Sequence, residues 1–133
     1  MSGGHRAVPH TADIAVEAWA DSREECLAEA VRGLVESFAD IEGAPRGVGV
    51  DVAVTAEHDE DLLVEVLEEV IYQVEVHGRL AVDVSPCPAG LRLATVPAEA
   101  VEQVGAMPKA VTAHDVRFGE EAGTWRAHVV VDV

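Results

Sequence analysis

Two stretches of the chain carry the hydrophobic spacing of an amphipathic helix. In residues 22–40 and 59–77, apolar residues recur every three or four positions, which places them on one helix face. Ser22 and Glu25 have the spacing of a capping box at the start of the first stretch. Gly78 follows the second stretch and is suited to end it. The pattern therefore predicts two helices, each with one face turned to a core.

The other apolar residues alternate with polar ones, as they do in half-buried strands. The predicted strands cover residues 13–19, 48–55, 79–84, 91–96, 109–118 and 124–133. Turn-forming residues at 85–90 and 119–123 join the last four strands into two hairpins. Segment 98–104 is compatible with a short helix or a loop. This order predicts a single α+β domain over residues 1–133, with two helices packed on mainly antiparallel sheets.

The charge balance narrows the classes of partner. The 133 residues include 9 Lys+Arg and 25 Asp+Glu, which gives a formal net charge of −16. A surface this acidic argues against direct binding of nucleic acid and against docking on an anionic membrane, because both require a basic face. A basic protein or a cation remains compatible with it. The sequence contains no run of roughly twenty apolar residues that would span a membrane.

The cysteines and the remaining motifs indicate no enzyme class. Cys26 and Cys87 are isolated, without a CxxC pair, which is typical of a reduced, cytoplasmic protein. Cys26 lies on the apolar stripe of the first predicted helix and is expected in the core. The acidic run 57–61 lacks the glycine and the distal glutamate of a calcium loop, so it is interpreted as a solvated helix start. We therefore expect no catalytic residue and no site for an organic cofactor.

Carboxylates near the two ends of the chain form a candidate cation site. Asp13 is the first residue of the first predicted strand, and Asp132 is followed by the terminal carboxylate of Val133. If these three groups meet at a sheet edge, they repel one another strongly unless a cation neutralises them. Ligands that are all oxygen favour Ca²⁺, Mg²⁺ or Mn²⁺ over Zn²⁺. His10 or His114 is an additional candidate, as a ligand of Mn²⁺ or as a group that orients a carboxylate. Taken alone, the segment at Asp13 is also compatible with an ordinary turn, and the segment at Asp132 and Val133 with a frayed chain end.

Three motifs together resemble the archease family. They are Pro-His-Thr-Ala-Asp-Ile at 9–14, Lys-Ala-Val-Thr-Ala-His at 109–114, and a terminal strand at 125–133 with aspartate next to last. Residues 61–67 also fit the second helix of that family. The resemblance covers nearly the whole chain in the right order. The sequence departs from many relatives at 97–108, where it has no histidine, and at Ala113, where an aromatic residue is expected.

The resemblance implies a function and a ligand set. Archeases activate the GTP-dependent, Mn²⁺-using RNA ligase of tRNA splicing and RNA repair, promoting its guanylylation and its multiple turnover. By resemblance, a divalent cation is expected on Asp13, Asp132 and the carboxylate of Val133, with Ca²⁺ the ion expected in a structure and Mn²⁺ or Mg²⁺ as alternatives. The expected partner is the ligase protein in a transient complex, with no direct contact to nucleic acid or membrane.

Two other classes of function stay open at the level of sequence. The first is a general chaperone or modulator of RNA-processing enzymes, which would act on many proteins and would not depend on Asp13. The second is a metal-dependent hydrolase, in which the cation and His10 or His114 activate water. No substrate pocket or oxyanion donor is evident in the sequence to favour the hydrolase.

Overall fold

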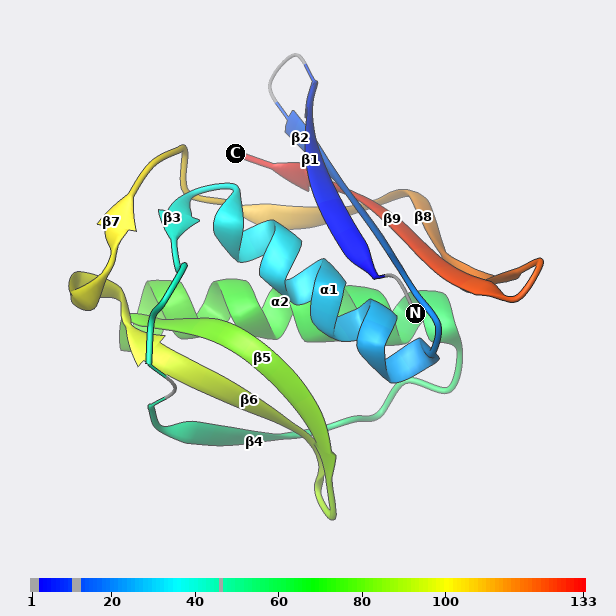
Figure 1. The fold of residues 1–133 in the computed structure, drawn as a ribbon, viewed down its shortest axis with the longest axis horizontal. Helices are drawn as coiled ribbons and strands as arrows, with labels where there is room; N and C mark the ends of the chain where they lie inside the picture. Colours follow the sequence, from blue (N-terminus) through cyan, green and yellow to red (C-terminus); the bar gives the residue numbers. More distant parts are fainter. Residues whose placement is uncertain (1–2, 11–12, 46) are drawn as a thin grey trace.

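The computed structural model describes residues 3–10, 13–45 and 47–133 (Figure 1). In chain order the elements are β1 (Gly4–His10), β2 (Asp13–Ala20), α1 (Arg23–Glu36), β3 (Ala39–Asp40), β4 (Gly49–Ala53), α2 (Asp59–His77), β5 (Arg79–Cys87), β6 (Gly90–Pro97), the 3₁₀ helix η1 (Ala98–Ala100), β7 (Glu102–Gln103), β8 (Ala110–Glu121) and β9 (Thr124–Asp132). The predicted order of two helices among antiparallel strands is confirmed.

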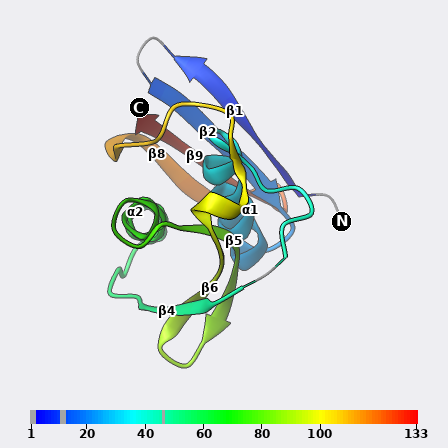
Figure 2. The same ribbon diagram turned by 90° about the vertical axis from the view of Figure 1, so that its left-hand side faces the viewer.

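The strands form antiparallel sheets on either side of the helices. Four strands pair in the order β1-β2-β9-β8, three pair as β4-β6-β5, and β3 pairs with β7. Helix α1 packs against β2 and β5, and α2 packs against β8 and β5. The helices therefore lie between the two larger sheets, and both sheets turn their other face to solvent (Figure 2).

The helices begin and end where local chemistry dictates. The Ser22 hydroxyl accepts a hydrogen bond from the backbone N–H of Glu25 at 3.1 Å, which confirms the predicted cap of α1. Helix α2 has the predicted bounds, and Gly78 ends it in the left-handed conformation at φ 62°. The predicted helix at 22–40 extends four residues too far at its C-terminal end, because Phe38 and Ala39 continue the apolar pattern in a buried but non-helical segment.

Two segments of the chain differ from the sequence-based expectation. Residues 4–10 form β1, which was not predicted because Pro9 and two glycines obscure any alternation. His10 is therefore the last residue of a strand that pairs with β2, with His10 opposite Asp13. Segment 98–104, for which a helix or a loop stayed open, contains η1 and the short strand β7.

One contiguous core joins both helices to both larger sheets. It is built largely from the apolar stripes of α1 and α2 and from the inward residues of β2, β6 and β9. Cys26 is fully buried in it, as predicted, and burial raises the pKa of its thiol to about 12. The thiol therefore stays protonated and serves as a small apolar core group.

A partly buried ionic contact fastens the edge strand β1 to α1, and it gives a pH-dependent prediction. The ring nitrogens of His5 lie 2.7 Å from Oε1 of Glu29 and 2.5 Å from Oε1 of Glu36. Burial lowers the pKa of His5, but the hydrogen bonds and charges of these glutamates outweigh it, so the pKa is raised above 6.5. The stabilisation is therefore complete below the unfolded pKa and is lost as pH rises through the folded pKa.

We expect His5→Gln to lower the free energy of unfolding by about 1 kcal/mol at pH 5.5 and by much less at pH 9. Urea denaturation of both proteins across this range measures the difference. A destabilisation by His5→Gln that is equal at both pH values would contradict the ionic contact.

Candidate functional site

Strand pairing brings the two aspartates singled out in the sequence into one row. In the β2–β9 register Asp13 is the Cα partner of Asp132, and Asp132 in turn pairs with Ala110 of β8. Directly opposite residues of an antiparallel pair share a sheet face, with Cβ atoms about 4.5–5.5 Å apart. Asp13 is half-buried and Asp132 is exposed. Two like charges in this position repel each other unless a cation or a proton neutralises them.

The end of the chain lies beside this row. Strand β9 ends at Asp132, and the half-buried Val133 follows it. The backbone N–H of Lys109 donates to the carbonyl of Asp132 at 2.8 Å, which fixes the end of β9 against the start of β8. The C-terminus thus lies at the same end of the four-stranded sheet as the last residue of β1 and the first residue of β2 (Figure 1).

The donors at this end of the sheet are carboxylate oxygens. Among the described residues, no three His, Cys, Asp or Glu side chains form a metal-binding group, so the third anionic donor beside Asp13 and Asp132 would be the main-chain carboxylate of Val133. A set made only of oxygens suits hard cations such as Ca²⁺, Mg²⁺ or Mn²⁺. Cation binding itself stays a prediction.

The two histidines proposed as additional ligands have different positions. His10 is next in the row beside Asp13, but its side chain lies outside the described residues. His114 is exposed within an irregular part of β8, where the pairing shifts between Thr112 and Arg117 and Asp115 has φ 57°. Because this bulge interrupts the alternation of the strand, the sheet face on which His114 lies cannot be deduced from its spacing to Thr112.

The same sheet face carries a second group of polar residues, which the sequence analysis missed. The inward residues of β2 and β9, such as Val16 and Val129, are at most 1% exposed, and their neighbours along the strand point to the other side. We call this other side the outer face, because it points away from α1. Its described residues on the central strands include Asp13, Glu17, Trp19, Arg126, His128 and Asp132. The alternation of polar and apolar residues along β9 could have indicated the three members on that strand, Arg126, His128 and Asp132.

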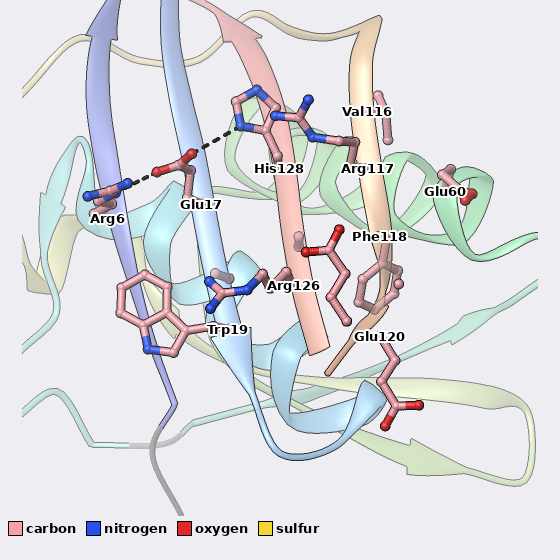
Figure 3. Close-up of a pocket in the computed structure, with 14 residues that line it drawn as sticks. Arg6, Glu17, Trp19, Glu60, Val116, Arg117, Phe118, Glu120, Arg126 and His128 are labelled. Atoms are coloured by element: carbon pink, nitrogen blue, oxygen red, sulfur yellow. Dashed lines mark hydrogen bonds and ion pairs between the residues drawn. The ribbon is translucent and has the colours of Figure 1, made fainter. Parts of the chain in front are cut away.

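A row of ionic contacts crosses the middle of the outer face. Nε of Arg6 donates to Oε1 of Glu17 at 2.5 Å, and Nδ1 of His128 lies 3.4 Å from the other carboxylate oxygen (Figure 3). The hydrogen bond from Arg6 is the largest influence on Glu17 and, with that from His128, holds the pKa of this carboxyl below its ordinary value despite partial burial. The register continues the row to Arg117, the partner of His128.

The next row toward the other end of the sheet contains Trp19 paired with Arg126. Together with the ionic row it lines an open pocket of about 850 Å³. Glu60, Glu120 and Glu121 also line it. This combination of arginine, glutamate, histidine and tryptophan side chains suits recognition of another molecule. Neither α1 nor α2 is long and apolar enough to cross a membrane, within the part of the chain that the structure describes.

Comparison with known proteins gives consistent matches over most of the chain. The model of the Archease protein family matches residues 5–133. An archease protein from Mycobacterium tuberculosis is 45% identical over 99% of this chain and 76% of its own length. An archease from Methanopyrus kandleri is 29% identical over 95% of this chain and 96% of its own.

Two solved structures share the fold. The solution structure of Methanobacterium thermoautotrophicum protein 1598 has a TM-score of 0.74 and 23% identity, covering 98% of this chain and 99% of that one. The crystal structure of a Thermotoga maritima archease, described as a possible chaperone, has a TM-score of 0.69 and 24% identity, covering 95% and 94%. These structures support the arrangement of helices and antiparallel sheets described above.

Proposed function

Because this chain belongs to the archease family, we propose that it activates a GTP- and Mn²⁺-dependent RNA ligase by protein contact, without a chemical step of its own. The observation that carries the proposal is the pairing of Asp13 with Asp132 beside the end of the chain. Residues more than a hundred positions apart contribute two carboxylates to one row, and such a row is stable when a cation neutralises it.

In this proposal Asp13, Asp132 and the terminal carboxylate of Val133 hold one divalent cation, Ca²⁺, Mn²⁺ or Mg²⁺. When bound, the ion supplies the positive charge that the facing carboxylates require. The protein contributes a preorganised donor set, since β-sheet pairing fixes both aspartates and the Lys109–Asp132 backbone hydrogen bond holds the end of β9.

Stability measurements test the cation site without the ligase. In metal-free buffer, Asp132→Asn is expected to stabilise the protein by up to about 1 kcal/mol, because it removes a like-charge pair. Saturating Ca²⁺ or Mn²⁺, at about 100 times the dissociation constant, is expected to stabilise the wild type by about 2.7 kcal/mol and the variant hardly at all. Asp61→Asn, an exposed acid on α2, is the control. Equal stabilisation of wild type and Asp132→Asn by the ion would contradict the site.

A tail fused after Val133 tests the terminal carboxylate separately. The tail converts this carboxylate to a peptide group and removes one anionic donor, so we expect it to weaken cation binding. A tailed protein that binds the ion as tightly as the untailed one would exclude Val133 from the ligand set.

Ligase turnover with RNA in excess over enzyme tests the activating function. We expect the wild type to raise the number of products formed per ligase, whereas Asp13→Asn and Asp132→Asn fail to do so while remaining folded. Stimulation by both variants at the wild-type level would contradict the role of the cation site.

A general chaperone is the second candidate, and two observations favour it. The structurally similar Thermotoga maritima archease is described as a possible chaperone, and Tyr72, Val76, Val104 and Met107 expose large apolar side chains. This function predicts that the wild type and the Asp13→Asn variant prevent the aggregation of unrelated unfolded proteins equally well. No protection of such proteins at equimolar ratio would exclude it.

A further inference from the structure

The outer face of the four-stranded sheet changes the sign of its charge along the strands. At one end lies the acidic row of Asp13 and Asp132. His128 lies four residues before Asp132 on β9, which is about 13 Å at the rise of an extended strand. The row of His128 also contains Arg6 and Arg117. The face is therefore anionic at the candidate cation site and carries its arginines toward the other end.

Two arginines of the outer face, one on β8 and one on β9, can form an ion pair with another molecule. Arg117 and Arg126 are exposed and form no ion pair with any described residue. Arg23, Arg32 and Arg92 elsewhere in the chain each pair with a carboxylate. The nearest outer-face carboxylate on β2, that of Glu17, is already occupied by Arg6 and His128. In a chain with 25 acidic residues, two unpaired arginines on one face are a distinctive surface.

The rest of the pocket decides which class of molecule this surface fits. Glu60, Glu120 and Glu121 line the same pocket, so the surface is mixed in sign. A nucleic-acid backbone requires a continuous basic face and would be repelled by these carboxylates. A protein can instead match each sign with its opposite.

Trp19 adds the second element of a protein-binding surface. Its indole ring is half-buried and lies against the backbone of Gly4 on β1, where a Cβ atom would come within 2.6 Å of the ring. The absence of a side chain at Gly4 thus leaves room for the ring, and Arg126 is the partner of Trp19 on β9. Tryptophan and arginine are the residue types that most often dominate the energy of protein–protein interfaces.

From this arrangement we infer that the outer face of the β1-β2-β9-β8 sheet is the docking surface for the ligase, an inference that rests on the proposed function. Carboxylates of the ligase face Arg117 and Arg126, and an apolar part of the ligase packs on Trp19, beside Arg126 on the neighbouring strand. The opposite signs at the two ends fix the direction of docking, because a reversed complex would place like charges together. The acidic row of Asp13 and Asp132 is then held against a cationic part of the ligase.

Charge reversal tests this surface. We expect Arg117→Glu and Arg126→Glu each to weaken binding to the purified ligase about tenfold, and the double variant about a hundredfold, in low-salt titrations by calorimetry. Arg79→Glu is the matched control, since Arg79 also has no ionic partner in the described structure but lies on β5 of the other sheet. It is expected to bind like the wild type. Unchanged urea denaturation of each variant excludes a loss caused by unfolding.

A crosslinking experiment locates the contact independently. A photoreactive residue at Val130, between the acidic and ionic rows, is expected to crosslink to the ligase. The same residue at Val76, which is 56% exposed on α2, is expected not to crosslink.

Each other outcome overturns the inference in a distinguishable way. If the wild type stimulates the ligase and the double variant binds equally well, the docking surface is wrong and the proposed function stands. If RNA alone binds the protein and the double variant loses this binding, the surface serves nucleic acid instead. If the wild type neither binds nor stimulates the ligase, the docking surface and the proposed function both fail.

Discussion

Phe38→Ala is expected to lower the free energy of unfolding by about 3–5 kcal/mol. The Phe38 side chain is 1% exposed and packs in the core immediately after the end of α1. Its backbone carbonyl also accepts a hydrogen bond from the N–H of Val104 at 2.8 Å, which ties the segment before β8 to the end of the helix. Truncation removes the buried ring and leaves a cavity that the fixed backbone on both sides cannot fill.

Urea denaturation at neutral pH measures the loss. Domains of this size are usually stable by only about 5–15 kcal/mol, so the variant is expected to be partly unfolded near 37 °C. Tyr72→Ala, which truncates a 47% exposed aromatic residue on α2, is the control and should change stability by less than about 0.5 kcal/mol. A loss below about 1 kcal/mol for Phe38→Ala would contradict its place in the core.

Gly90→Ala is expected to cost about 2–5 kcal/mol for two independent reasons. Gly90 has φ 140°, which is strained for any residue with a Cβ atom. A Cβ atom there would also lie 2.6 Å from the carbonyl oxygen of Val52 and 2.9 Å from the amide nitrogen of Val54. Both atoms belong to the backbone around β4, so they cannot move aside without breaking the β4–β6 pairing.

The thermal unfolding midpoint measures this effect, and Gly119→Ala is the matched control. Gly119 lies in β8 without a positive φ, and a Cβ atom there meets nothing within 4 Å. The control is expected to unfold within a few degrees of the wild type, whereas Gly90→Ala unfolds far lower. Similar midpoints for the two variants would show that the β5–β6 turn tolerates a side chain.

The elements that the sequence predicted best are those whose signals are local. Both helices have apolar stripes, and the cap by Ser22 and the stop at Gly78 depend only on neighbouring residues. Strand β1 was missed because Pro9 and the two glycines obscure its alternation, although its partner β2 follows directly in the chain. The end of α1 was misplaced because burial of Phe38 continues after the helical hydrogen bonds stop.

The candidate site follows the same division. The sequence marked Asp13 and Asp132 by charge and by resemblance, but their position opposite each other depends on the β2–β9 register, a contact between the two ends of the chain. The outer-face row of Arg6, Glu17 and His128 required three strands in register and was therefore invisible in the sequence. The bulge in β8 likewise changed the setting of His114, because spacing alone cannot reveal residues inserted into one strand of a pair.

The two cysteines differ in accessibility, which allows a fluorescent label to be attached at a single position. Cys26 is inaccessible and its thiol remains protonated at neutral pH, whereas Cys87 is partly exposed where β5 turns into β6. Maleimide dyes, which require an accessible thiolate, are therefore expected to attach at Cys87 alone in the unmodified chain. The fluorophore would be on the sheet opposite the paired aspartates, so a binding partner could be titrated without a label in its path (Figure 1).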